Sequence, residues 1–185
     1  MMHLPLLSAI IADDIERCRI LSLVRDLRLP DCWIGAGFVR NAVWDHLHGF
    51  PSSPLSNDVD VIWFDPIKSD GALDGHIENE LRAAAPSIKW SVKNQRRMHI
   101  RNNDAPYLSA TDAMRYWPET ATAIAVKMKA SSELEFSAPY GLEDLFNLIV
   151  RPAPNFVSET REIFLGRITQ KQWLKTWPRL EVIEP

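Results

Sequence analysis

The chain has 185 residues, of which 46% are hydrophobic and 24% charged, and its formal net charge is −3. This length and composition are typical of one folded domain and exclude a disordered, collagen-like or membrane-spanning protein. The slight acidity also argues against a protein that coats nucleic acid, because such proteins normally carry an excess of Lys and Arg.

The first third of the chain predicts two helices and two strands. Apolar residues recur at steps of three and four over 5–28, which predicts an amphipathic helix that ends before Pro30. A short apolar strand at 32–34 runs into a Gly-Ala-Gly turn, and the helical pattern resumes over 38–48. The β-branched and aromatic residues of 57–64 predict the second strand.

The rest of the chain continues this mixture. The predicted elements are a helix over 70–85, a strand over 88–92, a loop or short helix over 93–101, a helix over 109–117, a β-hairpin of 122–129 and 133–138, a helix over 141–150, and short tail helices that include 169–177. Such an order predicts a layered α/β or α+β domain. Composition does not divide the chain, so we expect a single domain, 1–185, with 151–185 as a helical tail packed on it.

Two carboxylates stand at the start of the predicted strand 57–64. Side chains at positions i and i+2 of a strand lie on one face, with α-carbons roughly 6.6 Å apart, so Asp58 and Asp60 converge on one region. Unpaired carboxylates at such a distance repel each other, and a divalent cation is the usual relief. The pair therefore predicts a metal site.

The Gly-Ala-Gly turn predicts a site for an anion. Gly35 and Gly37 let backbone N–H groups approach a ligand closely, and the helix that begins there points its positive end outward. Arg40, in the first turn of that helix, could bind phosphate oxygens through both of its terminal nitrogens. Together with the acid pair, the turn indicates a nucleotide site. The alternative is a packing turn beside solvated surface acids.

Several segments resemble known nucleotidyltransferases. The segment 33–41, Trp-Ile-Gly-Ala-Gly-Phe-Val-Arg-Asn, and the segment 56–61, Ser-Asn-Asp-Val-Asp-Val, are similar to the signature of the DNA-polymerase-β-like superfamily. CCA-adding members of that superfamily carry a Gly-Gly-x-Val-Arg-Asp turn before an Asp-x-Asp strand. Together with 90–99, 117–122 and 138–146, these segments also resemble a bacterial family of short nucleotidyltransferase-like proteins, over nearly the whole chain.

The resemblance implies the polymerase-β-like nucleotidyltransferase fold, an α+β fold in which a mixed β-sheet is flanked by helices. It also implies that Gly37 faces the triphosphate of an NTP and that Asp58 and Asp60 hold Mg²⁺ or Mn²⁺. Ala36 replaces the first glycine of the superfamily's pair, and Asn41 replaces its acid. We do not expect the long carboxy-terminal tRNA-binding part of CCA-adding enzymes, so the resemblance does not extend to tRNA tailing.

The superfamily usually has a third carboxylate, on a later neighbouring strand. Glu135, in the predicted strand 133–138, is the best-placed candidate for this catalytic role. If 130–132 is the hairpin loop, however, Glu135 lies directly opposite Lys127, and the two form a cross-strand ion pair worth at most about 1 kcal/mol. Weaker candidates are Asp65, Glu143 and Asp144.

A basic segment follows the predicted strand 88–92. Its charged residues are Lys93, Arg96, Arg97 and Arg101. They could neutralise a triphosphate or contact a polynucleotide, and the alternative is a solvated basic loop. With this segment included, the residues expected to contact the nucleotide are Gly35, Gly37, Arg40, Asn41, Lys93 and Arg96.

These patterns support one leading hypothesis and two alternatives. The leading one is a metal-dependent nucleotidyltransferase that moves a nucleoside monophosphate from an NTP to an unidentified hydroxyl acceptor and releases pyrophosphate. The alternatives are a non-catalytic nucleotide-binding or protein-interaction module on the same fold, and a nucleic-acid binder that uses 93–101. We expect neither a long nucleic acid nor a membrane as partner.

Two further features bear on where the protein resides. Cys18 and Cys32 are expected to be reduced thiols, because a domain of this size does not need a disulfide. The apolar stretch 4–12 follows no Lys or Arg and is followed directly by two aspartates, so it predicts neither a signal peptide nor a membrane span. We therefore expect a cytoplasmic protein.

Overall fold

The computed structural model describes residues 3–51, 58–68, 70–158 and 160–184. Its centre is a five-stranded sheet in the order β3-β2-β1-β4-β5. The strands are β1 (Trp33–Gly35), β2 (Val59–Trp63), β3 (Trp90–Asn94), β4 (Ala125–Met128) and β5 (Leu134–Ser137). In this sheet β2 and β3 run parallel, and the other neighbouring pairs run antiparallel. The expected α+β fold with a mixed sheet flanked by helices is confirmed.

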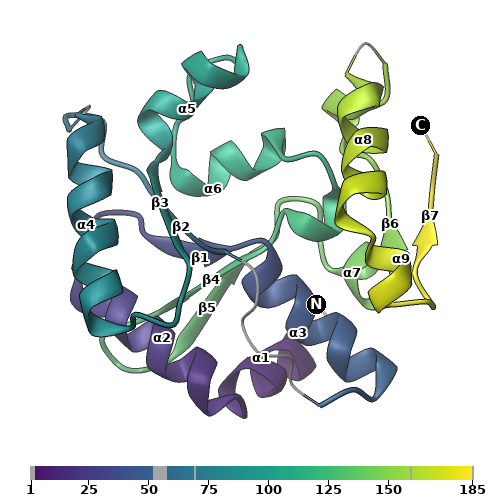
Figure 1. Cartoon of the computed structure of the whole chain (residues 1–185), viewed down its shortest axis with the longest axis horizontal. Coiled ribbons are helices and arrows are strands. Elements are labelled where there is room, and N and C mark those ends of the chain that lie inside the picture. Colours follow the sequence, from purple (N-terminus) through teal and green to yellow (C-terminus); the bar gives the residue numbers. More distant parts are fainter. Residues whose placement is uncertain (1–2, 52–57, 69, 159, 185) are drawn as a thin grey trace.

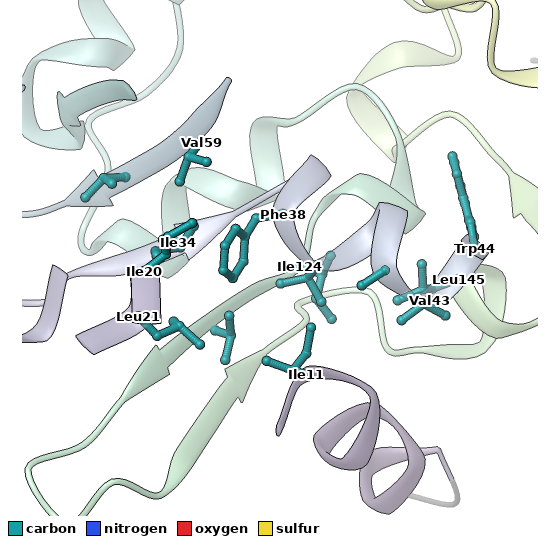
Figure 2. Packing of buried hydrophobic residues seen from close by; sticks show 14 of the residues in the cluster. Ile11, Ile20, Leu21, Ile34, Phe38, Val43, Trp44, Val59, Ile124 and Leu145 are labelled. Atoms are coloured by element: carbon teal, nitrogen blue, oxygen red, sulfur yellow. The ribbon is translucent and has the colours of Figure 1, made fainter. Parts of the chain in front are cut away.

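One face of the sheet carries the main hydrophobic core. The helices that cover it are α1 (Leu4–Ala12), α2 (Ile15–Asp26), α3 (Gly37–His48) and α4 (Gly71–Ala84). Val59, Val61 and Trp63 of β2 all belong to this core, because alternate side chains of a strand share a face. Figure 2 shows part of the core, with Ile34 and Val59 from the sheet and Phe38 from α3.

The opposite face of the sheet carries a smaller cluster. It contains Trp33 of β1, Ile62 of β2 and Ala125 of β4, and it is covered by α6 (Ala110–Ala113) and η1 (Met114–Tyr116). Helix α5 (Gln95–Asn102) follows β3 directly and contacts α6. In Figure 1, α5 and α6 lie above the sheet, whereas α1, α2 and α3 lie below it. The polar side chains of this upper face, Asp60 among them, therefore emerge beside α5, α6 and η1.

The last part of the chain folds back onto α3. Its elements are β6 (Ile149–Val150), η3 (Pro154–Phe156), α8 (Arg161–Lys171), α9 (Trp173–Thr176) and β7 (Glu181–Val182), and β7 pairs with β6. The rings of Trp173 and Trp177 lie edge-on against Trp44 of α3, with centroids 5.8 and 5.1 Å away. This packing holds α9 against α3, with α8 leading into α9 (Figure 1).

The expected helix over 5–28 is wrong as a single helix, because α1 and α2 are separate. The carboxylate of Asp14 accepts a hydrogen bond from the backbone N–H of Arg17 at 2.9 Å and caps the start of α2. The apolar spacing continues across the break, since both helices pack on the same core. The periodicity alone therefore could not reveal the cap.

Two later predicted helices are also corrected. Instead of a helix over 141–150, the chain forms α7 (Glu143–Phe146) and then the strand β6, because Leu148 adopts a positive φ of 60° between them. The expected helix over 169–177 is split at Gln172, whose φ of 50° separates α8 from α9.

Smaller differences affect the predicted hairpin and the second strand. The hairpin is confirmed, although its first strand begins at Ala125, after the short helix η2 (Thr120–Thr122). The second strand begins at Val59, and the predicted strand residue Asn57 lies outside the described residues. Cys18 and Cys32 are both free thiols. None of the described helices is long and apolar enough to cross a membrane.

Candidate active site

A cavity of about 610 Å³ lies where the start of β2, the start of α3 and the tail helices meet. We call it the first cavity. Its charged lining residues are Arg17, Arg40, Asp58, Asp60, Lys89, Arg167 and Lys171. Arg17 and Arg167 are paired with Asp14 and Glu119, which do not line the cavity, so Arg40, Lys89 and Lys171 remain to face the two acids. This balance fits an anionic ligand together with a bound cation.

The two acids, Asp58 and Asp60, lie at the start of β2. Asp60 lies opposite Gly35 of β1 and opposite Ser91 of β3. Burial raises the pKa of Asp60 and the neighbouring Asp58 raises it further, although a hydrogen bond from Ser91 partly offsets both effects. Asp58 is half exposed and pairs with Lys89, with 2.6 Å between Nζ and Oδ1. Lys89 thus partly neutralises the acid pair in this structure.

The same pair is suited to a divalent cation. Carboxylate oxygens are the donors that Mg²⁺ prefers, and this ion usually takes one or two protein carboxylates and completes its coordination with water and substrate phosphates. Burial is the main reason why the pKa of Asp60 is raised, and a bound cation would favour its charged form. Among the described residues that line this cavity, Asp58 and Asp60 are the only acids.

The turn before α3 presents backbone N–H groups to the cavity. Ala36, Gly37 and Phe38 line it, and the first N–H groups of a helix have no acceptor within the helix. The N–H of Ala36 itself donates to the carbonyl oxygen of Ile124 at 2.9 Å. With φ 55° and ψ −123°, Ala36 occupies a region that favours glycine. The strained turn aims the positive end of α3 into the cavity.

The two glycines of the turn have different roles. A Cβ on Gly37 would meet Asn41 Nδ2 at 3.5 Å and Arg40 Nη2 at 3.6 Å, so Gly37 leaves open the space in front of these groups. A Cβ on Gly35 would lie only 2.7 Å from Cη2 of Trp117, and Gly35 does not line the cavity. Contrary to our expectation of a nucleotide contact, Gly35 makes room for Trp117 against the sheet.

Arg40 is a buried cation that lines the first cavity. Its side chain is 5% exposed, donates to Thr122 Oγ1 at 2.8 Å and Asn41 Oδ1 at 2.9 Å, and stacks on Trp173 with 4.4 Å to the ring centroid. Its Nε has no hydrogen-bond partner, and no described carboxylate forms an ion pair with it. Burial lowers the pKa of Arg40 to about 10, so it stays charged at neutral pH. An anion in the first cavity would compensate this charge.

Four cations of the first cavity were missed by the sequence reasoning. Arg17 comes from α2 and donates through Nε to the carbonyl oxygen of Phe38 at 2.9 Å. Lys89 precedes β3, and Arg167 and Lys171 come from α8. In the sequence each is an ordinary charged residue of a predicted helix, strand or tail segment, so no local signal could have found them.

Glu135 is not brought to the acid pair. It lies on β5, three strands away from β2 in the sheet, and its Oε1 is 3.2 Å from Lys127 Nζ. The register pairs Lys127 with Glu135, as the hairpin alternative predicted. We therefore correct the expected catalytic role of Glu135: the structure uses this residue in a cross-strand ion pair.

The charged residues of the basic segment, 93–101, do not gather at one site. Lys93 lines a second cavity, of about 240 Å³, which shares Asp60 with the first. Arg96 lines neither cavity, and Arg97 forms an ion pair with the buried Asp74. The expected contact of Arg96 with a nucleotide is thus not supported by its position.

The weaker acidic candidates also lie outside both cavities. The carboxylate of Asp65 accepts hydrogen bonds from the N–H groups of the following turn. Glu143 accepts from the N–H of Leu142, and Asp144 pairs with Arg151 at 3.0 Å. Each of these carboxylates therefore has a local structural role.

Comparisons with known proteins give the family. A profile described as nucleotidyltransferase matches residues 22–182. An NMR structure described as a CCA-adding enzyme head domain is 34% identical, with a TM-score of 0.87, over 97% of this chain and 95% of that chain. No curated protein sequence matches significantly.

A more distant structure shares the fold. It is a CCA-adding enzyme in complex with CTP, 16% identical, with a TM-score of 0.54 over 94% of this chain and 49% of that chain. This chain spans about half the length of that enzyme, and at this identity the likeness concerns the fold alone. The profile match and the similarity to the head domain cover nearly all of the sequence. The chain therefore belongs to the nucleotidyltransferase family.

Proposed function

We propose that the protein is a magnesium-dependent nucleotidyltransferase whose active site is the first cavity. The observation that carries this proposal is the gathering, in one cavity, of an Asp-x-Asp pair, the start of a helix and a buried arginine that forms no ion pair with any described carboxylate. Membership of the family and the 34% identity to a CCA-adding enzyme head domain support the same reaction class.

The triphosphate of an NTP would lie at the start of α3. The N–H groups of Gly37 and Phe38 can donate to phosphate oxygens there, and the helix dipole favours the negative charge. Arg40 lies next to Gly37, and Lys171 approaches from α8 beside Arg167, which is paired with Glu119. Charged donors of this kind bind phosphate more strongly than neutral ones. The CTP bound to the distant CCA-adding enzyme is consistent with a nucleoside triphosphate ligand.

Asp58 and Asp60 would hold Mg²⁺ or Mn²⁺. When bound, such an ion neutralises charge on the phosphate oxygens and makes the attacking hydroxyl easier to deprotonate. Asp58 would exchange its contact with Lys89 for this ion, and the flexible Lys89 side chain would then be available to a phosphate.

The reaction joins the acceptor oxygen to the α-phosphorus of the NTP and breaks the bond to the β-phosphate, so pyrophosphate leaves and the hydroxyl proton passes to solvent. The contribution of this chain is to align the two reactants and to compensate the charge on the phosphates. Such a transfer needs few reacting side chains, in keeping with the two acids found in the first cavity.

The experiment that tests the proposal follows transfer of label from α-labelled NTPs, together with pyrophosphate release, in Mg²⁺ and in Mn²⁺. Asp58→Asn and Asp60→Asn should each lower the rate by roughly a hundredfold or more, because they remove a carboxylate that acts on the charge of the transition state. Equal rates in the wild type and both variants would contradict the proposal.

One observation favours a second candidate function. The described lining residues of the first cavity include no third carboxylate that could activate an acceptor. A nucleotide-binding module without turnover would show metal-dependent stabilisation by NTP and no release of pyrophosphate. The labelling experiment above separates the two functions directly.

A further inference from the structure

A second cavity meets the first at Asp60. It has a volume of about 240 Å³ and shares Ala36, Asp60, Thr122 and Arg167 with the first cavity. A carboxylate that lies between two cavities can face one ligand from each side. The volume is below the roughly 300–1,000 Å³ of sites for drug-sized ligands, so the second cavity suits a small molecule.

The second cavity has a flat apolar wall beside Asp60. Gly35 is the cross-strand neighbour of Asp60, and the space where its side chain would be is filled by the six-membered ring of Trp117. Pro118 and, from α5, Met98 also line the cavity. A partly exposed indole and a thioether are good surfaces for a flat ring.

The other side chains that line the second cavity are mostly polar and carry little net charge. Ser91, Gln95 and Asn102 offer hydroxyl and amide groups, which can donate to or accept from hydroxyls. Of the two cations that line the cavity, Arg167 is paired with Glu119 at 2.6 Å, and Lys93 lies 3.9 Å from Glu78. A nucleic-acid backbone is bound through several uncompensated cations, which this cavity lacks.

We propose that the second cavity binds the acceptor, a small hydroxylated molecule with a flat ring. This inference rests on the proposed nucleotidyl transfer. The ring would stack on Trp117, and a hydroxyl would point past Asp60 to the α-phosphorus of the nucleotide in the first cavity. Its oxygen then forms the new bond to phosphorus, pyrophosphate leaves, and the hydroxyl proton passes to solvent.

NMR titration of the full chain tests this inference. Trp117→Phe identifies the indole signal of Trp117 among those of the seven tryptophans. The probes are adenosine, which has a flat ring and hydroxyls, ribose, which has hydroxyls alone, and a short single-stranded RNA. Each is added with and without Mg²⁺ and a non-hydrolysable ATP analogue. Adenosine should shift the Trp117 signal saturably, and ribose should bind roughly tenfold more weakly because it cannot stack.

Two variants on the same helix sharpen the test. Met98→Trp fills the second cavity and should weaken adenosine binding roughly tenfold, the loss expected for one ring contact. Ile100→Trp is the matched control, because Ile100 is 75% exposed and lines neither cavity, and it should leave adenosine binding unchanged. The adenosine titration of the wild-type protein tests the inference even if either variant fails to fold.

The outcomes for the two proposals are separate. A shift of the Gly37 amide by the ATP analogue reports the first cavity, and its absence would contradict the proposed function. If that shift occurs but adenosine leaves the Trp117 signal unmoved, the acceptor inference alone is overturned. RNA that moves the Trp117 signal at lower concentration than adenosine would overturn the assignment to a small molecule.

Discussion

Replacement of Arg40 by methionine distinguishes a residue that serves the fold from one that serves a ligand. Arg40 is buried, with Thr122 and Asn41 as hydrogen-bond partners and the rings of Trp44 and Trp173 beside its guanidinium. Methionine has a similar length and no charge, so Arg40→Met removes the cation without leaving a large hole. We expect the unfolding free energy of the free protein to change little and the affinity for the nucleotide to fall.

The magnitude follows from the contacts of Arg40. Burial lowers its pKa from the usual value to about 10, which corresponds to a cost of about 3 kcal/mol for holding the charge in the fold. This cost is fully present at neutral pH and is relieved only as the pH rises through about 10. Against it stand two hydrogen bonds of about 1 kcal/mol each and cation–π contacts of about 1 kcal/mol. The two sides nearly cancel, so the unfolding free energy of Arg40→Met should stay within about 1 kcal/mol of the wild type.

Urea unfolding with and without Mg²⁺ and a non-hydrolysable NTP analogue measures both effects. A phosphate that loses its charged partner should bind roughly 10- to 100-fold more weakly, so stabilisation by the analogue should shrink in Arg40→Met. Arg19→Met, which removes an exposed ion pair with Glu16 on α2 and whose residues line neither cavity, is the matched control and should change neither quantity appreciably. Destabilisation by more than about 3 kcal/mol with nucleotide binding intact would refute the reasoning.

Three other predictions follow from the same geometry. Ala36→Gly should raise the unfolding free energy in urea by about 1 kcal/mol, because relief of the positive φ outweighs the entropy of glycine; a loss would contradict the strained turn. Burial and Asp58 raise the pKa of Asp60, so the folded state binds that proton more tightly than the unfolded state does. Without metal, thermal stability should therefore gain from this group as the pH falls towards 3.8, and pH-dependent melting curves should show that the gain is missing in Asp60→Asn. Glu135→Gln should cost at most about 1 kcal/mol through the lost pair with Lys127 and leave pyrophosphate release unchanged, and a well-folded but inactive variant would restore its catalytic role.

Local patterns were sufficient for most of the fold and for the centre of the candidate site. The Gly-Ala-Gly turn and the acid pair lie on two short strands that pair directly, with Asp60 opposite Gly35. Their order and their positions on a strand end and a helix start were visible in the sequence. The two helix breaks at Asp14 and Gln172 were not, because a cap and a positive φ interrupt an apolar pattern that continues on both sides.

The rest of the site depends on tertiary structure. Arg17 and Arg167 reach the first cavity from helices far apart in the chain, and no spacing rule links them. For Glu135, counting residues from the hairpin loop gave the correct partner, Lys127. Its distance from the acid pair follows from the order of the strands in the sheet, which the sequence pattern did not specify. The packing of Trp117 over Gly35 likewise joins residues whose proximity only the fold explains.

The central claim is that nucleotide and metal bind together at Asp58 and Asp60. Titration calorimetry with a non-hydrolysable NTP analogue tests it most directly, with Mg²⁺ and with EDTA, on the wild type and on the double variant Asp58→Asn/Asp60→Asn. We predict saturable binding by the wild type in Mg²⁺, and binding weakened by roughly tenfold or more in EDTA or in the double variant. Equal affinity in all four titrations would contradict the account.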